Sequence, residues 1–250
     1  MKAVITGASS GIGKEIAKVL DGKGIETVLV ARREDKLRKL AAELKNKPQI
    51  IVMDLSLPDA PENLYKMVPD ADILVNNAGF GVFGRFDKTP LGREKELIAL
   101  NITAVHTLTK LYLTDFKEKN RGYILNVASI AAFMTGPIFS SYYASKSYVM
   151  RLSSAIYREL KKDKSAVKIS CLCPGPVVTE FNNVAGVNFG PLGMKADKVA
   201  EIAVKGMFKG KRIILPGALI KCCRIFAKLL PECVVSKVVM MIQSAKTLEK

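Results

Sequence analysis

Residues 3–13 read AVITGASSGIG, a stretch that joins an apolar strand to a glycine-rich turn and the start of a helix. Glycines let the backbone of such a turn approach a phosphate group closely. The helix N-terminus that follows offers free N–H groups and the positive end of the helix dipole. The stretch predicts a cradle for a pyrophosphate; the alternative is a purely structural turn. The cradle would consist of Gly7, Ser9, Ser10, Gly11, Ile12 and Gly13.

After this turn, apolar runs of strand length alternate with longer patterns of helical period. Buried strands separated by helices predict an α/β fold, a Rossmann-like doubly wound parallel sheet with helices on both faces. Such sheets bind ligands beyond the carboxyl ends of their strands. The predicted strands are 3–6, 26–31, 49–53, 73–76, 122–127, 167–173 and 212–215.

Size and composition are those of one globular domain spanning residues 1–250. Of the 250 residues, 49% are hydrophobic, which suffices for a large core. No apolar run approaches the ~18 residues of a membrane-spanning helix. The first motif begins so early that we expect no signal peptide. Five cysteines without a CxxC pair, and a single histidine, predict a cytoplasmic protein without a metal site.

The net charge of +16 allows several kinds of partner. Nucleic acid, an anionic membrane surface, acidic substrates and a lysine-rich solvated surface are all compatible with it. The chain has no tryptophan, no arginine-rich block and no basic–aromatic motif. We therefore expect no nucleic-acid partner.

A second motif, YYASK, occupies residues 142–146. Tyr142 and Lys146 are four residues apart on a predicted helix and share one face. A phenol is a poor acid–base catalyst at its reference pKa of about 10, and a nearby ammonium lowers that pKa. Tyr143 could also reach the lysine, so spacing alone leaves both tyrosines open. Ser129 lies 13 residues before Tyr142, just past a predicted strand, where a lone serine is usually only a cap.

Together the glycine turn, the sequence NNAG at 76–79, Ser129 and the YxASK pattern resemble the short-chain dehydrogenase/reductase family over residues 1–179. The resemblance implies hydride transfer between a nicotinamide and a small-molecule carbonyl or alcohol. It assigns proton transfer to Tyr142 and contact with the nicotinamide ribose to Lys146, and both residues count among the implied cofactor contacts. It implies that the Ser129 hydroxyl hydrogen-bonds the substrate oxygen as charge develops there. It also implies that Asn101 holds a water in a proton relay.

The end of the second predicted strand indicates which nicotinamide cofactor binds. Folds that prefer NAD carry an acidic residue there, which bonds the ribose 2′-hydroxyl. Arg32 and Arg33 stand there instead, and guanidinium groups suit a phosphate. We therefore predict NADP(H); the alternative is that the two arginines begin a solvated helix. By resemblance, further cofactor contacts are Asp54, Leu55, Asn77, Ala78, Gly79, Pro174, Gly175, Val177 and Thr179.

The remaining sequence bears on the substrate. Residues 180–196 combine glycines with apolar side chains and predict a substrate lid. Residues 217–250 predict an amphipathic extension with Lys221 and Arg224 on one helical face. This face suits either a peripheral membrane contact or packing on the domain or on a second subunit. The pattern is similar to the long-chain 3-oxoacyl and steroid reductase branch of the family, which implies an apolar substrate.

Two classes of function stay open at this point. One is an NADPH-dependent enzyme that reduces a carbonyl, or oxidises the alcohol, of a long-chain 3-oxoacyl or steroid-like compound. The other is an NADP(H)-sensing module without turnover. Because Ser129, Tyr142 and Lys146 are all present, we favour the enzyme. The resemblance further implies a homodimer or homotetramer that pairs through the helices after Asn101 and from Tyr142.

Overall fold

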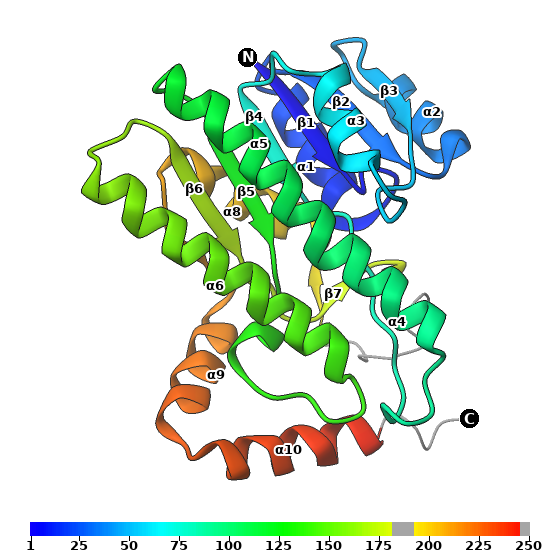
Figure 1. Cartoon of the computed structure of the whole chain (residues 1–250), viewed down its shortest axis with the longest axis vertical. Helices are drawn as coiled ribbons and strands as arrows, with labels where there is room; N and C mark the ends of the chain where they lie inside the picture. The colour runs from blue at the N-terminus through cyan, green and yellow to red at the C-terminus, as the bar shows by residue number, and fades with distance from the viewer. Residues whose placement is uncertain (182–192, 246–250) are drawn as a thin grey trace.

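The computed structural model describes residues 1–181 and 193–245 (Figure 1). A parallel sheet lies at its centre, with the strand order β3-β2-β1-β4-β5-β6-β9. The predicted doubly wound, Rossmann-like sheet is therefore confirmed. Its strands are β1 (Lys2–Thr6), β2 (Glu26–Ala31), β3 (Gln49–Val52), β4 (Ile73–Asn76), β5 (Tyr123–Val127), β6 (Lys168–Leu172) and β9 (Ile213–Ile214).

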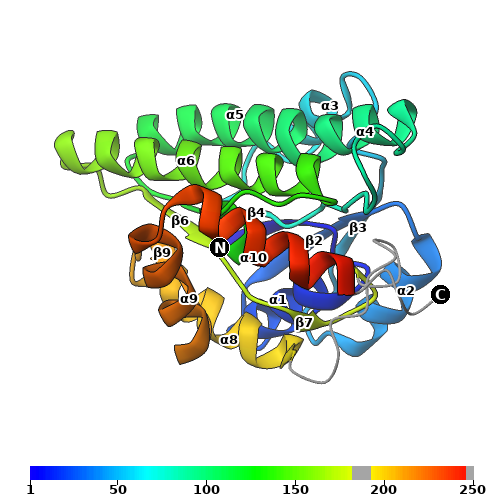
Figure 2. The ribbon, with the colours of Figure 1, turned by 90° about the horizontal axis from the view of Figure 1, so that it is seen from below.

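Helices cover both faces of this sheet (Figure 2). One layer consists of α3 (Ala60–Met67), α4 (Leu91–Ile98), α5 (Val105–Glu118) and α6 (Ser140–Lys162). The other layer consists of α1 (Gly11–Asp21), α2 (Glu34–Glu43) and α8 (Ala196–Phe208).

Strand β1 shows why the strands are apolar throughout. Successive side chains of a strand point to opposite faces. Ala3 and Ile5 belong to the core beneath α1 and α8, whereas Val4 belongs to the core beneath α3 and α5. All three are fully buried, as in other parallel sheets covered on both faces.

The direction of winding changes between β1 and β4. β1 pairs with β2 on one side and with β4 on the other. A crevice opens at such a switch point, beyond the carboxyl ends of the strands. The glycine turn after β1 and the segments after β4 and β5 meet at this end of the sheet (Figure 1).

Two features differ from the sequence prediction. A small parallel sheet of β7 (Val177–Val178) and β8 (Met194–Lys195) flanks the predicted lid, and two-residue strands are too short to leave a periodic pattern. Most of the lid, residues 182–192, lies outside the described residues. The C-terminal extension forms two helices, α9 (Ala218–Leu229) and α10 (Glu232–Ala245), and the second was not predicted.

Two kinds of feature are absent from the described residues, 1–181 and 193–245. No helix among them is long and apolar enough to span a membrane. No group of three or more His, Cys, Asp and Glu side chains within them could hold a metal ion.

Candidate active site

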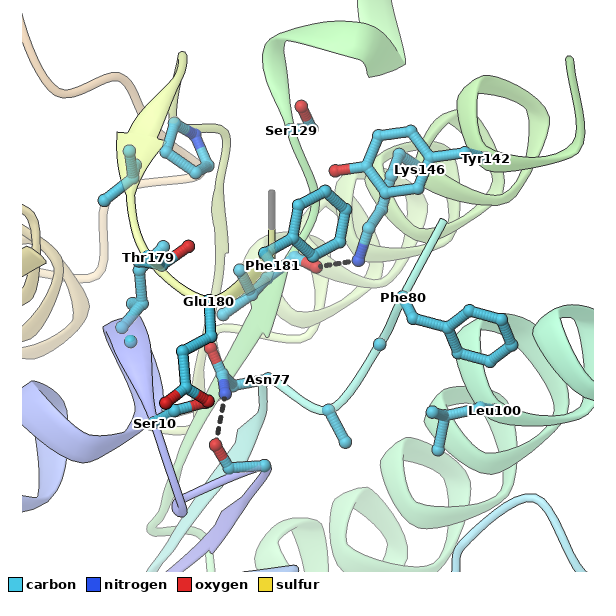
Figure 3. Close-up of a pocket in the computed structure, with 18 of the residues that line it drawn as sticks. Ser10, Asn77, Phe80, Leu100, Ser129, Tyr142, Lys146, Thr179, Glu180 and Phe181 are labelled. Atoms are coloured by element: carbon cyan, nitrogen blue, oxygen red, sulfur yellow. Dashed lines mark hydrogen bonds between the residues drawn. The ribbon is translucent and has the colours of Figure 1, made fainter. Parts of the chain in front are cut away.

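A cavity of about 490 Å³ lies at the carboxyl ends of the strands (Figure 3). Its lining brings together the glycine turn, the end of β2, the segments after β3, β4 and β5, the first turns of α6 and the segment after β6. All the site residues predicted from sequence line it except Gly13 and Asn101. Segments that are far apart in the chain therefore converge on one place.

Two glycines of the turn are required because neighbouring parts of the chain lie too close for a side chain there. Gly7 has a φ of +65°, and a Cβ there would lie 2.8 Å from Ala78 Cα. A Cβ on Gly13 would lie 2.5 Å from the Gly7 carbonyl oxygen. The Asn77 amide donates to that oxygen at 3.2 Å and ties the end of β4 to the turn. Ser10 is the N-cap of α1 and makes no side-chain cap bond. This cradle fits a pyrophosphate.

Arg33 extends from the end of β2 over the glycine turn. Its Nη2 donates to the hydroxyls of Ser9 and Ser10, both at 3.0 Å, and its Nη1 lies 2.7 Å from Glu180 Oε2. Lys36 pairs with the same carboxylate. Hydrogen bonds from Lys36 and Arg33 lower the pKa of Glu180 to about 2. Lys36 was missed in the sequence, although its spacing of three from Arg33 on α2 indicates a shared face.

Arg32 is held differently. Its Nη1 lies 3.3 Å from Asp54 Oδ2 and 3.4 Å from Glu96 Oε1, so two carboxylates share its charge. Burial raises the pKa of Asp54, but hydrogen bonds from Ser56 and the charge of Arg32 outweigh it, and the net shift is downward. The two arginines are therefore not equivalent, because carboxylates already balance Arg32 from two sides.

Tyr142 and Ser129 meet at the inner end of the cavity (Figure 3). The Tyr142 ring stacks on Phe139, with the centroids 4.5 Å apart and the planes 16° apart. Burial raises the pKa of Tyr142, and a hydrogen bond with Ser129 partly opposes the shift. Ser129 Oγ also accepts from the Ala131 N–H at 3.2 Å, where it caps the 3-10 helix η2 (Ile130–Phe133). The serine is both a cap and a site residue.

Lys146 lies one turn along α6 and is buried. Its Nζ donates to the Val127 carbonyl at 3.0 Å and lies 5.8 Å from the centroid of the Tyr142 ring. Burial lowers the pKa of Lys146 to about 8. The sequence predicted that this ammonium would lower the pKa of Tyr142. That prediction is wrong for this structure, because desolvation of the phenol dominates and raises its pKa.

Asn101 is fully buried in a π-helical turn, η1 (Ala99–Ala104), just behind the cavity wall. Its Oδ1 accepts from the Phe80 N–H at 3.1 Å, and its Nδ2 donates to the Phe80 carbonyl at 2.9 Å and to Ser145 Oγ at 3.1 Å. A Cβ on Gly79 would lie 2.9 Å from Asn101 Oδ1 and 3.3 Å from Lys146 Nζ. The amide thus braces the segment after β4 beside the lysine. π-Helical turns occur frequently at functional sites.

Comparison with known proteins identifies the family. The family model for short chain dehydrogenases matches residues 1–187. The chain belongs to this family. A 7beta-hydroxysteroid dehydrogenase of Mediterraneibacter gnavus is 28% identical over 212 residues, which cover 82% of this chain and 81% of that protein. A very-long-chain 3-oxoacyl-CoA reductase of Phaeosphaeria nodorum is 34% identical over 194 residues, which cover 73% of this chain and 56% of that protein.

A solved structure agrees with this assignment. The short-chain dehydrogenase from Sphingobium yanoikuyae, in complex with NADPH, matches with a TM-score of 0.81 and 27% identity. The match covers 92% of this chain and 96% of that one.

In this short-chain dehydrogenase, Tyr143 directly follows Tyr142 in the sequence but has a different environment. Its hydroxyl accepts a hydrogen bond of 2.9 Å from Gln243 Nε2, on the inner side of α10. Burial raises the pKa of Tyr143, and the bond to Gln243 partly opposes that shift. The geometry therefore favours Tyr142, with Ser129 beside it, as the proton donor. Gln243 was missed because no local pattern links it to a residue 100 positions away.

Aromatic side chains give the short-chain dehydrogenase an apolar wall next to this end of the cavity. The ring of Phe181 lies 5.4 Å from that of Tyr142, and the ring of Phe139 stacks on Tyr142 at 4.5 Å. Phe80 and Leu100 line the cavity as well (Figure 3). The wall suits an apolar molecule more than a charged one. Of the predicted lid, only its first part, including Phe181, is described at this wall.

Proposed function

We propose that the protein is an NADPH-dependent oxidoreductase that reduces the carbonyl group of an apolar substrate, or oxidises the corresponding alcohol. One observation carries this proposal. Ser129, Tyr142 and buried Lys146 converge at the inner end of a cavity whose other end holds the glycine turn and Arg33. Membership of the short-chain dehydrogenase family supports the reaction class.

The proposed chemistry divides among three side chains. When bound, the nicotinamide supplies the hydride. The Ser129 hydroxyl holds the substrate oxygen as charge develops on it, and Tyr142 donates its proton to the same oxygen. Burial raises the pKa of Tyr142, which favours the protonated phenol that a proton donor needs. The Lys146 ammonium binds the nicotinamide ribose, and Asn101 holds the water that returns the proton.

The proposed cofactor is NADP(H). Arg33 and Lys36 form a cationic pair beside the glycine turn, and in this structure they hold the Glu180 carboxylate. A carboxylate and a phosphate suit the same cationic partners, which supports a 2′-phosphate there. The NADPH complex of the Sphingobium relative supports the same cofactor.

The proposed substrate is apolar and large, such as a long-chain 3-oxoacyl or steroid-like compound. The aromatic wall around Phe139 and Phe181 supports this class, and so do the activities for which the Mediterraneibacter and Phaeosphaeria relatives are named. A sensing module without turnover is not favoured. Such a module would not need Ser129, Tyr142 and Lys146, yet all three are present and lie together in the cavity.

Four other features of the chain stay proposals. We expect one domain over residues 1–250, with a lid at 180–196, in the reducing environment of the cytoplasm. We also expect a homodimer or homotetramer that pairs through the outer surfaces of α5 and α6 (Figure 2). Sedimentation at micromolar concentration tests the assembly, and a monomer would contradict it.

A panel of carbonyl compounds tests the function. Steroid ketones, 3-oxoacyl thioesters and small ketones are each mixed with NADPH or NADH, and cofactor absorbance is followed. We expect NADPH oxidation, with a higher kcat/KM for the large apolar ketones than for small ones. Tight NADPH binding without turnover on the whole panel would favour the sensing module instead.

A further inference from the structure

The outward side of α10 is unusual for a helix at a protein surface. Its inward residues Val235, Val239 and Gln243 are buried, at a helical spacing of four. The outward residues are also largely apolar, and Val238, Met241 and Ile242 are between 48% and 72% exposed. A helix that is apolar on all sides is normally covered on all sides.

The preceding helix, α9, also carries large exposed apolar side chains. Ile225, Phe226 and Leu229 are 56%, 63% and 74% exposed. Together with Val238, Met241 and Ile242 of α10 they form what we call the apolar face. Both helices lie at the end of the molecule toward which β5 and β6 point (Figure 1), and α10 crosses in front of the sheet when viewed from that end (Figure 2).

A second cavity, of about 620 Å³, adjoins the apolar face between α8, β9 and α9. The two features share Ile225, which is exposed and also lines the cavity. No Asp or Glu is found among the described residues that line it. Within residues 1–181 and 193–245, none of its cations forms an ion pair. Those cations are Lys205, Lys209, Lys211, Lys221 and Arg224.

We infer that the apolar face and this basic cavity form one docking surface for an anionic membrane. The apolar face enters the interface between headgroups and acyl chains, and the cavity takes the anionic headgroups. Amphipathic helices bind membranes through this combination of buried apolar area and attraction to acidic lipid. The anionic surface of a cytoplasmic leaflet complements the net charge of +16.

A second copy of the chain is a poorer occupant. A twofold contact places the same patch of both subunits together. A twofold contact that covered both the apolar face and the cavity would enclose five cations from each subunit, with no described acidic side chain in either cavity to balance them. Like charges that face each other across an interface oppose association.

The docking surface lies close to the cavity of the candidate active site. Gln243, on the inward side of α10, lines that cavity and bonds to Tyr143. A membrane that covers the outward side of α10 would therefore lie one helix away from the aromatic wall. Such a position would let an apolar substrate enter directly from the lipid, an idea that rests on the proposed function. Membrane docking itself does not depend on that function.

Vesicle sedimentation of the full chain, without cofactor or substrate, tests the docking. One set of vesicles contains phosphatidylcholine alone, and the other contains about 30% phosphatidylserine. We expect binding to the anionic vesicles to be at least about tenfold stronger, and to weaken as salt is added. Equal binding to both sets, or no binding to either, would overturn the inference.

Paired variants separate the two parts of the surface. Leu229→Ser with Met241→Ser should weaken binding at least about tenfold. Lys205→Glu with Lys209→Glu should weaken it by more than about 25-fold, since each lost cation near such a surface contributes roughly fivefold and the new carboxylates add repulsion. Met67→Ser on α3 and Lys23→Glu after α1 are exposed controls and should bind as the parent does.

Two further measurements distinguish a loss of membrane binding from unfolding and from a change in oligomeric state. Thermal unfolding shows whether each variant is folded, and only variants with the parent's Tm are compared. Sedimentation velocity shows the oligomeric state of the same samples. If the Leu229→Ser and Met241→Ser variant dissociates an oligomer while vesicle binding is unchanged, the surface is a contact between copies and the inference is wrong.

Discussion

The side chain of Gln243 donates a hydrogen bond of 2.9 Å to the hydroxyl of Tyr143, across 100 residues of sequence. This bond directs the Tyr143 hydroxyl toward α10. The hydroxyl of the preceding residue, Tyr142, lies beside Ser129 instead. Two adjacent phenols thus have separate partners, and only one of them is placed to act with the serine.

We expect Tyr142→Phe to lower kcat by about 10²–10⁴-fold, since the substitution removes the proton donor and little else. The dissociation constant for NADPH should change less than about twofold, and fluorescence titration measures it. Tyr143→Phe is the matched control and should keep most of its activity. If Tyr143→Phe is the inactive variant, the assignment of the two tyrosines is reversed.

Arg33→Ala should weaken NADPH binding by about 10–100-fold, because hydrogen bonds to charged groups contribute about 1.5–3 kcal/mol. NADH binding should change little. Arg32→Ala should have a smaller effect on NADPH, because Asp54 and Glu96 already balance that charge. Arg38→Ala, on α2 and paired with Glu34, controls for loss of charge. Equal losses for NADPH and NADH in Arg33→Ala would contradict the cofactor assignment.

The rate of reduction should fall as pH rises through about 8. Burial lowers the pKa of Lys146 to about 8, from an ordinary value of 10.5, so the ammonium loses its proton above that pH. A neutral amine has one N–H donor fewer to share between the Val127 carbonyl and the nicotinamide ribose. The measurement is kcat/KM against pH in the direction of carbonyl reduction. Lys146→Arg keeps its charge over this range, so any activity that it retains should show no fall of kcat/KM near pH 8. A parent profile that is flat from pH 7 to 9 would refute the assignment of this fall to Lys146.

Asn101→Ala should lower the free energy of unfolding by about 1–3 kcal/mol, the cost of leaving buried polar groups without partners. The N–H and carbonyl of Phe80 are the groups that lose their partners. Urea denaturation gives the measurement. Asn63→Ala, at an exposed position on α3, should change it by less than about 0.5 kcal/mol. A similar value for both variants would show that the amide does not brace this segment.

The sheet and the cavity were predictable because their signals are local. A strand, a glycine turn and a helix follow one another within residues 3–13, and parallel strands bring their carboxyl ends to one edge. The position of the cavity therefore followed from sequence order, whereas most of its lining residues were predicted from the resemblance to the family. The boundaries of the strands differ by a residue or two, since ladder hydrogen bonds rather than apolar runs define them.

Features that depend on contacts between distant segments could not be predicted. The bond from Gln243 to Tyr143, and the pairing of Glu180 with Lys36, join segments with no shared pattern. The pKa of Tyr142 was predicted in the wrong direction, because spacing shows that Lys146 is near but does not show how completely the phenol is desolvated. Burial is a property of the assembled core.

The π-helical turn at Ala99–Ala104 carries one residue more than an α-helical turn would need. Deleting a single residue there would let the backbone return to α-helical hydrogen bonding at no loss of bonds. Each residue of an α-helix turns the chain by about 100°. The deletion would therefore rotate Asn101 away from Phe80, or it would rotate α4 out of its packing against the core. Chain length at this turn is thus a requirement separate from residue identity. A variant that keeps every side chain of the site but lacks one residue at this turn would form a regular helix and misplace the residues of the active site.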